Sequence, residues 1–303
     1  MYVYIKKLKN DEELVKKIDM PTFFKKIIIK IKKVFNIITV KKIDNNKYLY
    51  IIPKIEKLEK VKKIIENNKN KKIILSKKLK KYRKELNLKP QSEITKYFVK
   101  DILEYFMDVL NRKLELENVY ILLNQSNNEN IEMIQYLQNR VKTINIVTDN
   151  IKQYYYLKNK LDSEEMPITI SSNKNKSLKK AKFIINLDFN NDSISKYKIN
   201  ANSIIINSSN EIIKMQKYFQ GIIVNSIEIS EEKKEEKGNM YDEFDTIDMY
   251  ENILEKEPKY ADKVRKIKEN KVKIINLIGN NGIINLKEIL NMQKNIDKLQ
   301  KLE

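Results

Sequence analysis

The chain has 303 residues and a formal net charge of +20, and it contains no Cys, His or Trp. The absence of Cys and His excludes disulfides, thiolate zinc sites, cysteine nucleophiles and the most common general base. Catalysis by this chain would have to rest on Asp, Glu, Lys, Tyr, Ser or Thr. No catalytic constellation and no metal-binding motif stands out, and we expect neither a metal nor a bound cofactor.

The positive charge is concentrated at the start of the chain. Residues 1–100 hold 30 Lys or Arg and 10 Asp or Glu, whereas residues 101–303 hold 31 of each class. This asymmetry predicts two units with different surfaces and an anionic partner, a nucleic acid or a membrane surface, for residues 1–100. No apolar run is long enough to span a membrane and no signal peptide is visible, so we expect a cytoplasmic protein.

Residues 1–112 are predicted to form a basic α/β domain. Alternating and helical periodicities, together with turn residues, indicate the following elements: strands at 2–5, 37–43, 48–52 and 73–76, and helices at 12–18, 23–35, 55–67 and 92–111. The second and third strands flank Asp-Asn-Asn at 44–46, which is a hairpin signal.

The helix predicted at 23–35, FFKKIIIKIKKVF, is strongly amphipathic. Its apolar side chains gather on one face and its lysines lie mostly opposite. Two interpretations fit this pattern. Such a helix can lie on an anionic membrane surface, or it can turn its apolar face to the domain core and its lysines to solvent. We prefer the second, because any basic domain has to solvate its helices in this way.

A second basic segment follows the strand at 73–76. It has the sequence SKKLKKYRK and contributes six cations, namely Lys77, Lys78, Lys80, Lys81, Arg83 and Lys84. Clustered Lys and Arg can neutralise phosphates without reading a base sequence. No nucleic-acid-binding motif accompanies the segment, so a solvated loop after the strand is the interpretation that we prefer.

Residues 113–230 repeat a strand–helix unit. The predicted strands are 119–124, 143–148, 168–170, 183–187, 203–207 and 221–225, and the intervening helices or helical links are 129–141, 151–161 and 177–181. This alternation predicts a Rossmann-like, mostly parallel sheet with helices on both faces. Residues 231–303 are predicted to be a charged linker and a helical tail that packs back, with helices at 241–255 and 261–269, a strand at 273–278 and a final helix after Asn285.

Two stretches resemble a known family. SLKKAKFIINLDF at 177–189 and NANSIIINSS at 200–209 are similar to the helix-then-strand stretches in the nucleotide-binding domain of shikimate dehydrogenases and glutamyl-tRNA reductases. The resemblance implies a dinucleotide-binding fold. The family's catalytic Lys–Asp pair matches no motif in this chain, and the cysteine nucleophile of the reductases is absent.

The loop after the first strand of this region departs from the family pattern. A dinucleotide fold needs glycines there for a tight turn and for the close approach of pyrophosphate. This chain has Asn124-Gln125-Ser126-Asn127-Asn128-Glu129, and no Gly occurs before Gly221. Ser126 and Glu129 have the spacing of a capping box, which would satisfy the helix N-terminus and place a carboxylate where phosphate would bind.

Four residues are candidates for lining the crevice at the strand ends, namely Asn124, Ser126, Asp149 and Asp188. Asp149 ends the second strand, where an acidic residue bonds the ribose of NAD, although an N-cap for the helix near 151 is the alternative that we favour. Asp188 follows the fourth strand and is also compatible with a solvated loop. The turn from Gly279 to Gly282 lacks the Lys-Ser/Thr of a phosphate-binding P-loop.

Three functions therefore compete. The first is a non-catalytic Rossmann-like protein with a binding or regulatory role, and we favour it. The second is an NAD(P)-dependent oxidoreductase with an altered cofactor loop. The third, compatible with the first, is a nucleic-acid or anionic-surface binder that acts through residues 1–100. The sequence identifies no protein partner.

Overall fold

The computed structural model describes residues 2–15, 21–55, 58–83, 85–88, 93–152, 154, 168–209, 211–215, 217–231, 243–244, 247, 250, 254 and 257–292. The chain divides into unit 1, Met1–Lys89 with Glu235–Met249, and unit 2, Pro90–Lys234 with Tyr250–Glu303. We had predicted a first domain that ends at residue 112 and includes the long helix at 92–111. The boundary between the two units instead precedes this helix. That helix belongs to unit 2, where its first turns pack on α9 through the rings of Tyr97 and Tyr260.

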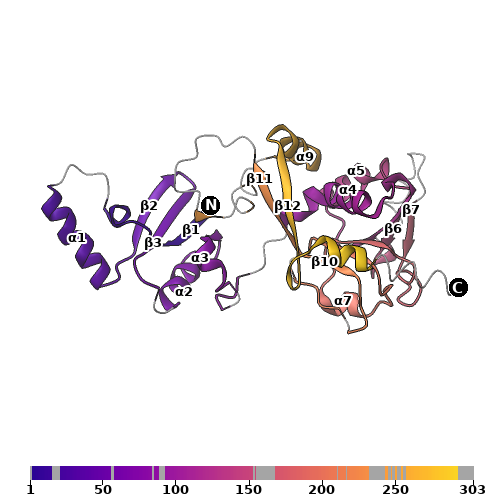
Figure 1. The fold of residues 1–303 in the computed structure, drawn as a ribbon, viewed down its shortest axis with the longest axis horizontal. Helices are drawn as coiled ribbons and strands as arrows, with labels where there is room; N and C mark the ends of the chain where they lie inside the picture. The colour runs from indigo at the N-terminus through magenta and orange to yellow at the C-terminus, as the bar shows by residue number, and fades with distance from the viewer. Residues whose placement is uncertain are drawn as a thin grey trace. The chain divides into compact units, whose positions relative to one another are not determined.

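Unit 1 is built on a four-stranded sheet with the order β2-β3-β1-β4 (Figure 1). Its elements are β1 (Tyr2–Lys7), η1 (Asp11–Leu14), α1 (Thr22–Val34), β2 (Thr39–Asp44), β3 (Lys47–Ile52), α2 (Glu59–Glu66), β4 (Lys72–Leu75) and α3 (Lys77–Lys80). The hairpin predicted around Asp-Asn-Asn is the antiparallel β2–β3 pair, whereas β1 runs parallel to both β3 and β4.

Both faces of this sheet are covered, as the alternation of strand side chains requires. Val3, Ile5 and Leu75 face α2 and α3 in one cluster. Tyr4 and its neighbours face the other way, toward Leu14 and Phe244. Residues 235–249 thus return to unit 1, although we had assigned 231–303 to a linker and a tail.

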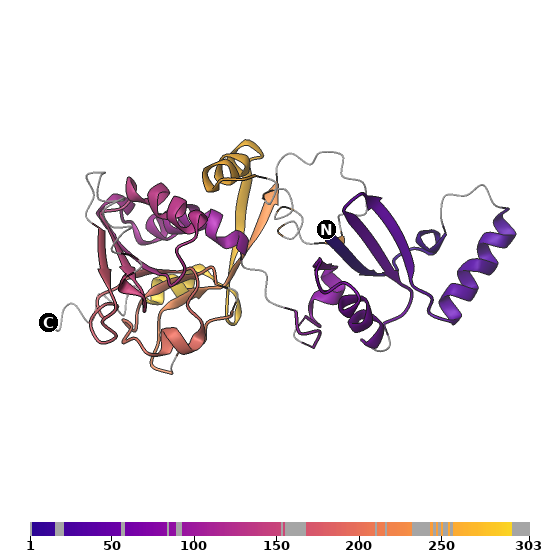
Figure 2. The ribbon, with the colours of Figure 1, turned by 180° about the vertical axis from the view of Figure 1, so that it is seen from behind.

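Helix α1 forms where it was predicted, but its apolar face does not enter the core. None of its residues is buried. The helix is held to unit 1 on its lysine-rich side, where the Lys32 Nζ donates to the Leu14 carbonyl (2.7 Å) and to the Thr39 hydroxyl (3.1 Å). Figures 1 and 2 show α1 beyond the β2 edge of the sheet. The core-facing interpretation was therefore wrong for the predicted apolar face, because α1 meets the domain through the other side, where Lys32 makes these bonds and Ile29 packs against the cluster around Tyr4 and Leu14.

Unit 2 contains a six-stranded, fully parallel sheet with the order β10-β9-β8-β5-β6-β7. The strands are β5 (Asn118–Leu122), β6 (Thr143–Val147), β7 (Ile168–Ser171), β8 (Phe183–Asn186), β9 (Ile204–Asn207) and β10 (Ile222–Val224). Counted along the chain, this is the order 3-2-1-4-5-6 of a doubly wound Rossmann-like sheet. The predicted fold class is confirmed, including the helices that flank the sheet.

Helices lie on both sides of this sheet (Figures 1 and 2). Its helical elements are η2 (Glu93–Phe98), α4 (Val99–Leu110), η3 (Leu114–Leu116), α5 (Asn128–Gln138), α7 (Asn191–Ser195) and α9 (Tyr260–Glu269). The predicted helical link at 177–181 is formed by turns instead. The helix predicted at 12–18 coincides in part with η1, and residues 16–18 lie outside the described residues, as do most residues of the helices predicted at 151–161 and 241–255.

The C-terminal part of unit 2 is not only helical. β11 (Ser226–Glu231), β12 (Val272–Gly279) and β13 (Gly282–Ile283) form an antiparallel sheet, and a helix covers residues 286–292. We had predicted β12 and the final helix but not β11, whose alternation of Ile227 and Ile229 with polar residues was the available signal. Among the described helices, none is both long and apolar enough to cross a membrane.

Candidate functional site

The strongest candidate for a ligand site in a Rossmann-like sheet is its topological switch point. In unit 2 this point lies between β5 and β8, which are neighbours in the sheet but lead to opposite halves of it. The loop that follows β5 contains Asn124 and Gln125, and the loop that follows β8 contains Asp188. In a dinucleotide-binding protein, amides of the first of these loops would hold the pyrophosphate.

Those amides already have an acceptor. The carboxylate of Asp188 accepts hydrogen bonds from the backbone N–H groups of Asn124 (2.7 Å) and Gln125 (2.6 Å), one on each oxygen. Burial raises the pKa of Asp188, and the two backbone hydrogen bonds partly offset this rise. The fully buried Tyr154 lies in the field of the same carboxylate, so that burial and the Asp188 charge raise the Tyr154 pKa. An intramolecular carboxylate thus fills the anion position of the switch point.

The other two crevice candidates at the strand ends join the same edge. The Asn124 side-chain oxygen accepts from the Thr148 hydroxyl (3.2 Å) and from the Asp149 N–H (2.8 Å), which ties β5 to β6. The Asp149 carboxylate accepts from the Tyr197 hydroxyl (3.0 Å) and pairs with Lys174 (3.5 Å). Asn124, Asp149 and Asp188 therefore do lie at one edge, but their polar atoms bond to the protein itself.

Ser126 does not form the predicted capping box. The N-cap of α5 is Asn127, whose side-chain oxygen accepts from the Asn130 N–H (2.8 Å). Glu129 turns instead to Lys96, Tyr97 and Lys263, with 2.6 Å to the Lys263 Nζ. Burial raises the pKa of Glu129, but the hydrogen bonds from Lys263, Lys96 and Tyr97 outweigh it and lower that pKa to about 2. The helix N-terminus is capped as expected, but by the next residue.

A row of asparagines, which the sequence analysis missed, closes the remaining strand ends. This asparagine row consists of Asn186, Asn207, Asn225 and Asn280. Each side-chain amide donates to the next side-chain oxygen, over 3.0, 2.8 and 2.6 Å. The signal was present in the sequence, because the apolar runs FIIN, SIIIN and GIIVN all end in Asn. The row links β8, β9 and β10 to the β12–β13 turn, so this edge is cross-braced by its own side chains.

No protein-family model and no curated protein matches the chain. The interpretation of its sites therefore rests on the geometry alone.

The predicted anionic-partner segment in unit 1 is partly helical. Lys77, Lys78 and Lys80 lie on α3, which we had interpreted as a loop, and Leu79 between them is buried. Lys77, Lys78 and Lys81 are exposed, Lys80 and Arg83 are half-buried, and Lys84 lies outside the described residues. The segment follows β4, whereas α1 adjoins β2 at the opposite edge of the sheet, so the two basic segments do not form one patch.

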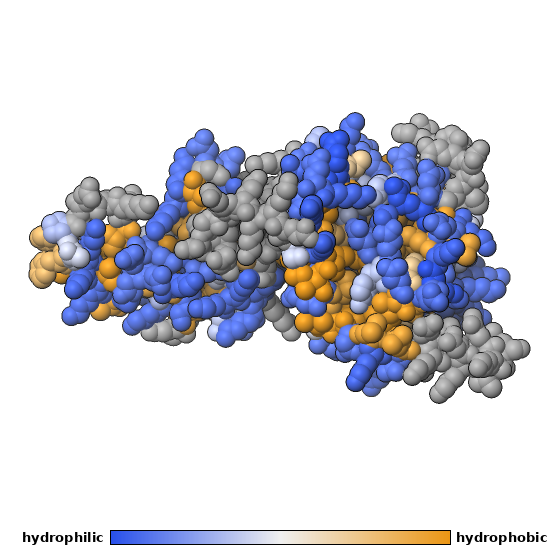
Figure 3. All heavy atoms as spheres, turned by 45° about the horizontal axis from the view of Figure 1, so that its top comes forward, coloured by the Kyte–Doolittle hydropathy of each residue, from blue (hydrophilic) through white to orange (hydrophobic). Residues whose placement is uncertain are grey.

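Helix α1 presents the largest unpartnered apolar face among the described residues of unit 1. Phe23, Val34 and Phe35 are 68%, 63% and 69% exposed, and Phe24, Ile27 and Ile31 continue the same face. Figure 3 shows hydrophobic atoms at the surface where α1 lies. Lys26 and Lys30 border this face, with Lys30 exposed beside Phe23 and Ile27. An exposed apolar stripe bordered by cations is the pattern of a helix that lies in a membrane interface.

Proposed function

We propose that this protein is a non-catalytic, peripheral binder of anionic membrane surfaces that docks through α1. The observation that carries the proposal is the outward direction of the apolar face of α1, with Lys26 and Lys30 along one border. A bilayer interface removes the phenylalanines from water while anionic headgroups pair with the lysines. The excess of 20 positive charges within residues 1–100 supports the same partner, since basic side chains near an anionic leaflet add favourable energy.

A membrane surface fits these observations better than a nucleic acid. Phosphate backbones are bound by cations and hydrogen-bond donors, and a nucleic acid duplex offers no apolar surface that would cover six exposed apolar side chains. The segment Lys77–Arg83 lacks such a face, and a single Tyr82 accompanies it. Binding of nucleic acid through residues 1–100 is thus the alternative outcome of the test rather than the proposal.

The test is sedimentation of the full chain with vesicles. Vesicles that contain phosphatidylglycerol should bind the protein, and pure phosphatidylcholine vesicles should bind it much less. The double variant Phe23→Ser/Phe35→Ser should bind about thirtyfold more weakly, because about 1 kcal/mol is lost for each aromatic side chain. The matched control is Leu116→Ser/Tyr218→Ser, which removes two large side chains of unit 2 that are 67% and 54% exposed.

Charge is tested separately. Lys26→Gln/Lys30→Gln should weaken binding to anionic vesicles and reduce its dependence on salt, whereas Lys179→Gln/Lys180→Gln in unit 2 should not. Equal binding of the phenylalanine variant and the parent protein would refute the proposal. So would tighter binding to DNA or RNA than to vesicles, or a stable dimer that the phenylalanine variant dissociates.

We further propose that unit 2 serves as a scaffold that uses no nicotinamide dinucleotide, in contrast to the oxidoreductase alternative. The support is the Asp188 carboxylate on the two loop amides that a pyrophosphate would need. Saturating NAD(H) or NADP(H) should leave the melting temperature unchanged, although a ligand present at about 100 times its Kd adds about 2.7 kcal/mol of stability. A clear thermal shift would favour the oxidoreductase.

A further inference from the structure

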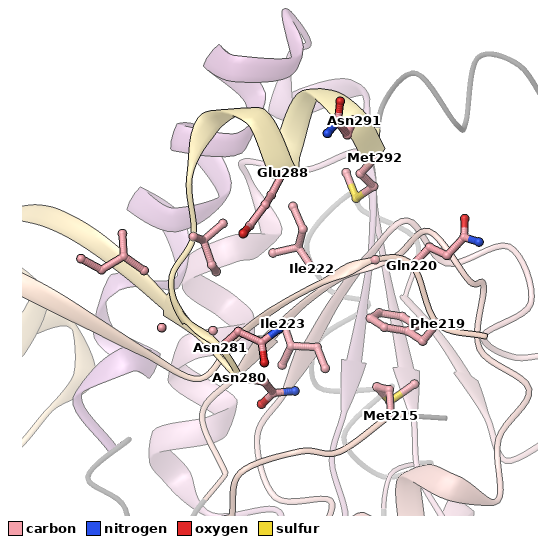
Figure 4. Close-up of a pocket in the computed structure, with 15 residues that line it drawn as sticks. Met215, Phe219, Gln220, Ile222, Ile223, Asn280, Asn281, Glu288, Asn291 and Met292 are labelled. Atoms are coloured by element: carbon pink, nitrogen blue, oxygen red, sulfur yellow. The ribbon is translucent and has the colours of Figure 1, made fainter. Parts of the chain in front are cut away.

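A pocket of about 510 Å³ lies in unit 2 beside β10, the edge strand of the parallel sheet (Figure 4). Its walls come from three places: the segment before β10, the turn between β12 and β13, and the helix at 286–292. It lies away from the switch point, and neither proposal above uses it.

The glycines of the chain are concentrated in the lining of this pocket. Three of the four glycines of the chain line it, namely Gly221, Gly279 and Gly282. A Cβ at Gly221 would come 2.0 Å from the Ser203 carbonyl oxygen, and Gly282 has a φ of +113°. Both positions therefore require glycine, the first for close packing on β9 and the second for the turn. A Cβ at Gly282 would meet no other atom within 4 Å, so the turn leaves open space at this position.

The charge of the pocket is opposite to that of the protein. One residue in five of the chain is Lys or Arg, yet among the described residues that line the pocket none is basic. Glu288 is the charged residue of the lining, and amides such as Asn280, Asn281 and Gln220 supply most of the other polar groups. An anionic ligand would meet a carboxylate and no cation here, so the lining selects against anions and favours neutral or cationic groups.

Glu288 is held in place by the helix it belongs to. Its N–H donates to the Asn285 side-chain oxygen (3.0 Å), and its carboxylate accepts from the Asn285 amide (3.2 Å). Asn285 thus caps the N-terminus of this helix through its side-chain oxygen, and its side-chain amide holds the Glu288 carboxylate. Figure 4 shows the Glu288 side chain extending from the helix toward the space above the Asn280–Asn281 turn. Phe219, Met215 and Met292 form the apolar side, and thioethers pack well against aromatic rings.

We propose that this pocket binds a compact, planar, cationic ligand of the arylamidine or aromatic-amine class. The aromatic body of the ligand contacts Phe219 and the two methionines, and its cationic end pairs with the Glu288 carboxylate and with amide oxygens of the turn.

Three nearly isosteric probes test the charge preference on the full chain by ligand-observed NMR titration. These are benzamidine, benzamide and benzoate, which carry positive, zero and negative charge on the same ring. Benzamidine should bind most tightly, benzamide about fivefold more weakly, and benzoate not measurably. The result that overturns the proposal is benzoate binding as tightly as benzamidine, or the absence of saturable benzamidine binding at the solubility limit of the protein.

Two variants assign the binding to this pocket. Glu288→Gln should reduce benzamidine affinity about fivefold and leave benzamide unchanged, because Gln keeps the cap but removes the charge. Glu269→Gln, an exposed glutamate on α9, should change neither affinity. Phe219→Leu should weaken both probes while thermal unfolding reports that the unit is still folded. Benzamidine binding that is unaffected by both Glu288→Gln and Phe219→Leu would place the ligand elsewhere and refute the assignment.

Discussion

The Asp188 carboxylate occupies the position at which a dinucleotide-binding sheet holds the pyrophosphate of its ligand. A carboxylate is a strong acceptor for backbone amides, and here its two oxygens each take one N–H of the loop after β5. Burial disfavours the charged form, which is why the pKa of this group is raised despite the two bonds. Burial of the Asp188 carboxylate therefore costs free energy, and the hydrogen bonds from the two loop amides offset part of this cost.

Asp188→Ala should lower the free energy of unfolding by about 1–3 kcal/mol, since two loop amides lose their acceptor. Urea denaturation measures this loss. Asp108→Ala removes an exposed carboxylate from α4 and should change stability by about 0.5 kcal/mol or less. A neutral Asp188→Ala variant would mean that solvent satisfies the amides equally well.

Glu129 is the second carboxylate with a defined role, because it binds Lys96 and Tyr97 of η2 and Lys263 of α9. Its pKa in the folded protein is about 2, below the ordinary value of 4.5. The ionised form is thus stabilised by folding. This contribution is complete above about pH 4.5 and is lost as the pH falls from there through about 2.

Glu129→Gln should therefore reduce stability by about 2 kcal/mol near pH 7, with a difference from the parent that shrinks as the pH falls toward 2. Thermal unfolding across pH 2–8 would record this convergence. Glu115→Gln, at an exposed position in η3, serves as the control that should follow the parent at every pH. A constant difference across the range would indicate a packing effect instead.

At the scale of elements, the asparagine row joins the ends of β8, β9 and β10 through side-chain hydrogen bonds. Asn207 is its centre, because it donates to the Asn225 side chain and the Glu211 carbonyl and accepts from Asn186 and Ser209. It is 1% exposed. Amides suit this position because they both donate and accept, so that each can bridge two neighbours.

Asn207→Ala should lower the free energy of unfolding by about 3 kcal/mol, because several buried partners lose their hydrogen bonds at once. Asn175→Ala, at an exposed turn, should be close to neutral. Chemical denaturation followed by far-UV circular dichroism compares the two. A loss below about 1 kcal/mol would show that the row is replaceable by water.

At the scale of the whole molecule, neither unit is a continuous stretch of the sequence. Residues 235–249 return to unit 1, where Phe244 is 2% exposed and lies edge-on to Tyr4 at a ring-centroid distance of 5.3 Å. Glu243 beside it pairs with the buried Lys6 (2.7 Å). Unit 1 is therefore completed by a segment from the far side of unit 2 in the sequence.

Phe244→Ala should destabilise unit 1 by about 3–5 kcal/mol, as expected for a buried aromatic side chain. Hydrogen exchange of β1 and β3 amides would show faster opening, while exchange of β5 and β8 amides in unit 2 stays unchanged. Tyr218→Ala, at an exposed position in unit 2, is the control. Equal acceleration in both units would contradict the assignment of residue 244 to unit 1.

The sequence by itself determined the fold class, most of the strands and helices, and the position of α1. These follow from local periodicity, since buried parallel strands read as apolar runs and amphipathic helices repeat every 3.6 residues. It also indicated that the loop after β5 lacks glycines and that the N-terminus of α5 is capped by a side chain. It did not distinguish Ser126 from Asn127 as the cap, because both residue types suit that position.

Only the tertiary structure decided which segments that are distant in the sequence come into contact. It placed Asp188 on the loop of β5, 63 and 64 residues away in sequence, and it brought Phe244 to β1. It also turned the apolar face of α1 outward, although we had expected this face to be buried. The physical reason is that periodicity gives each element a polar and an apolar side, whereas the partner of each side depends on contacts between distant segments.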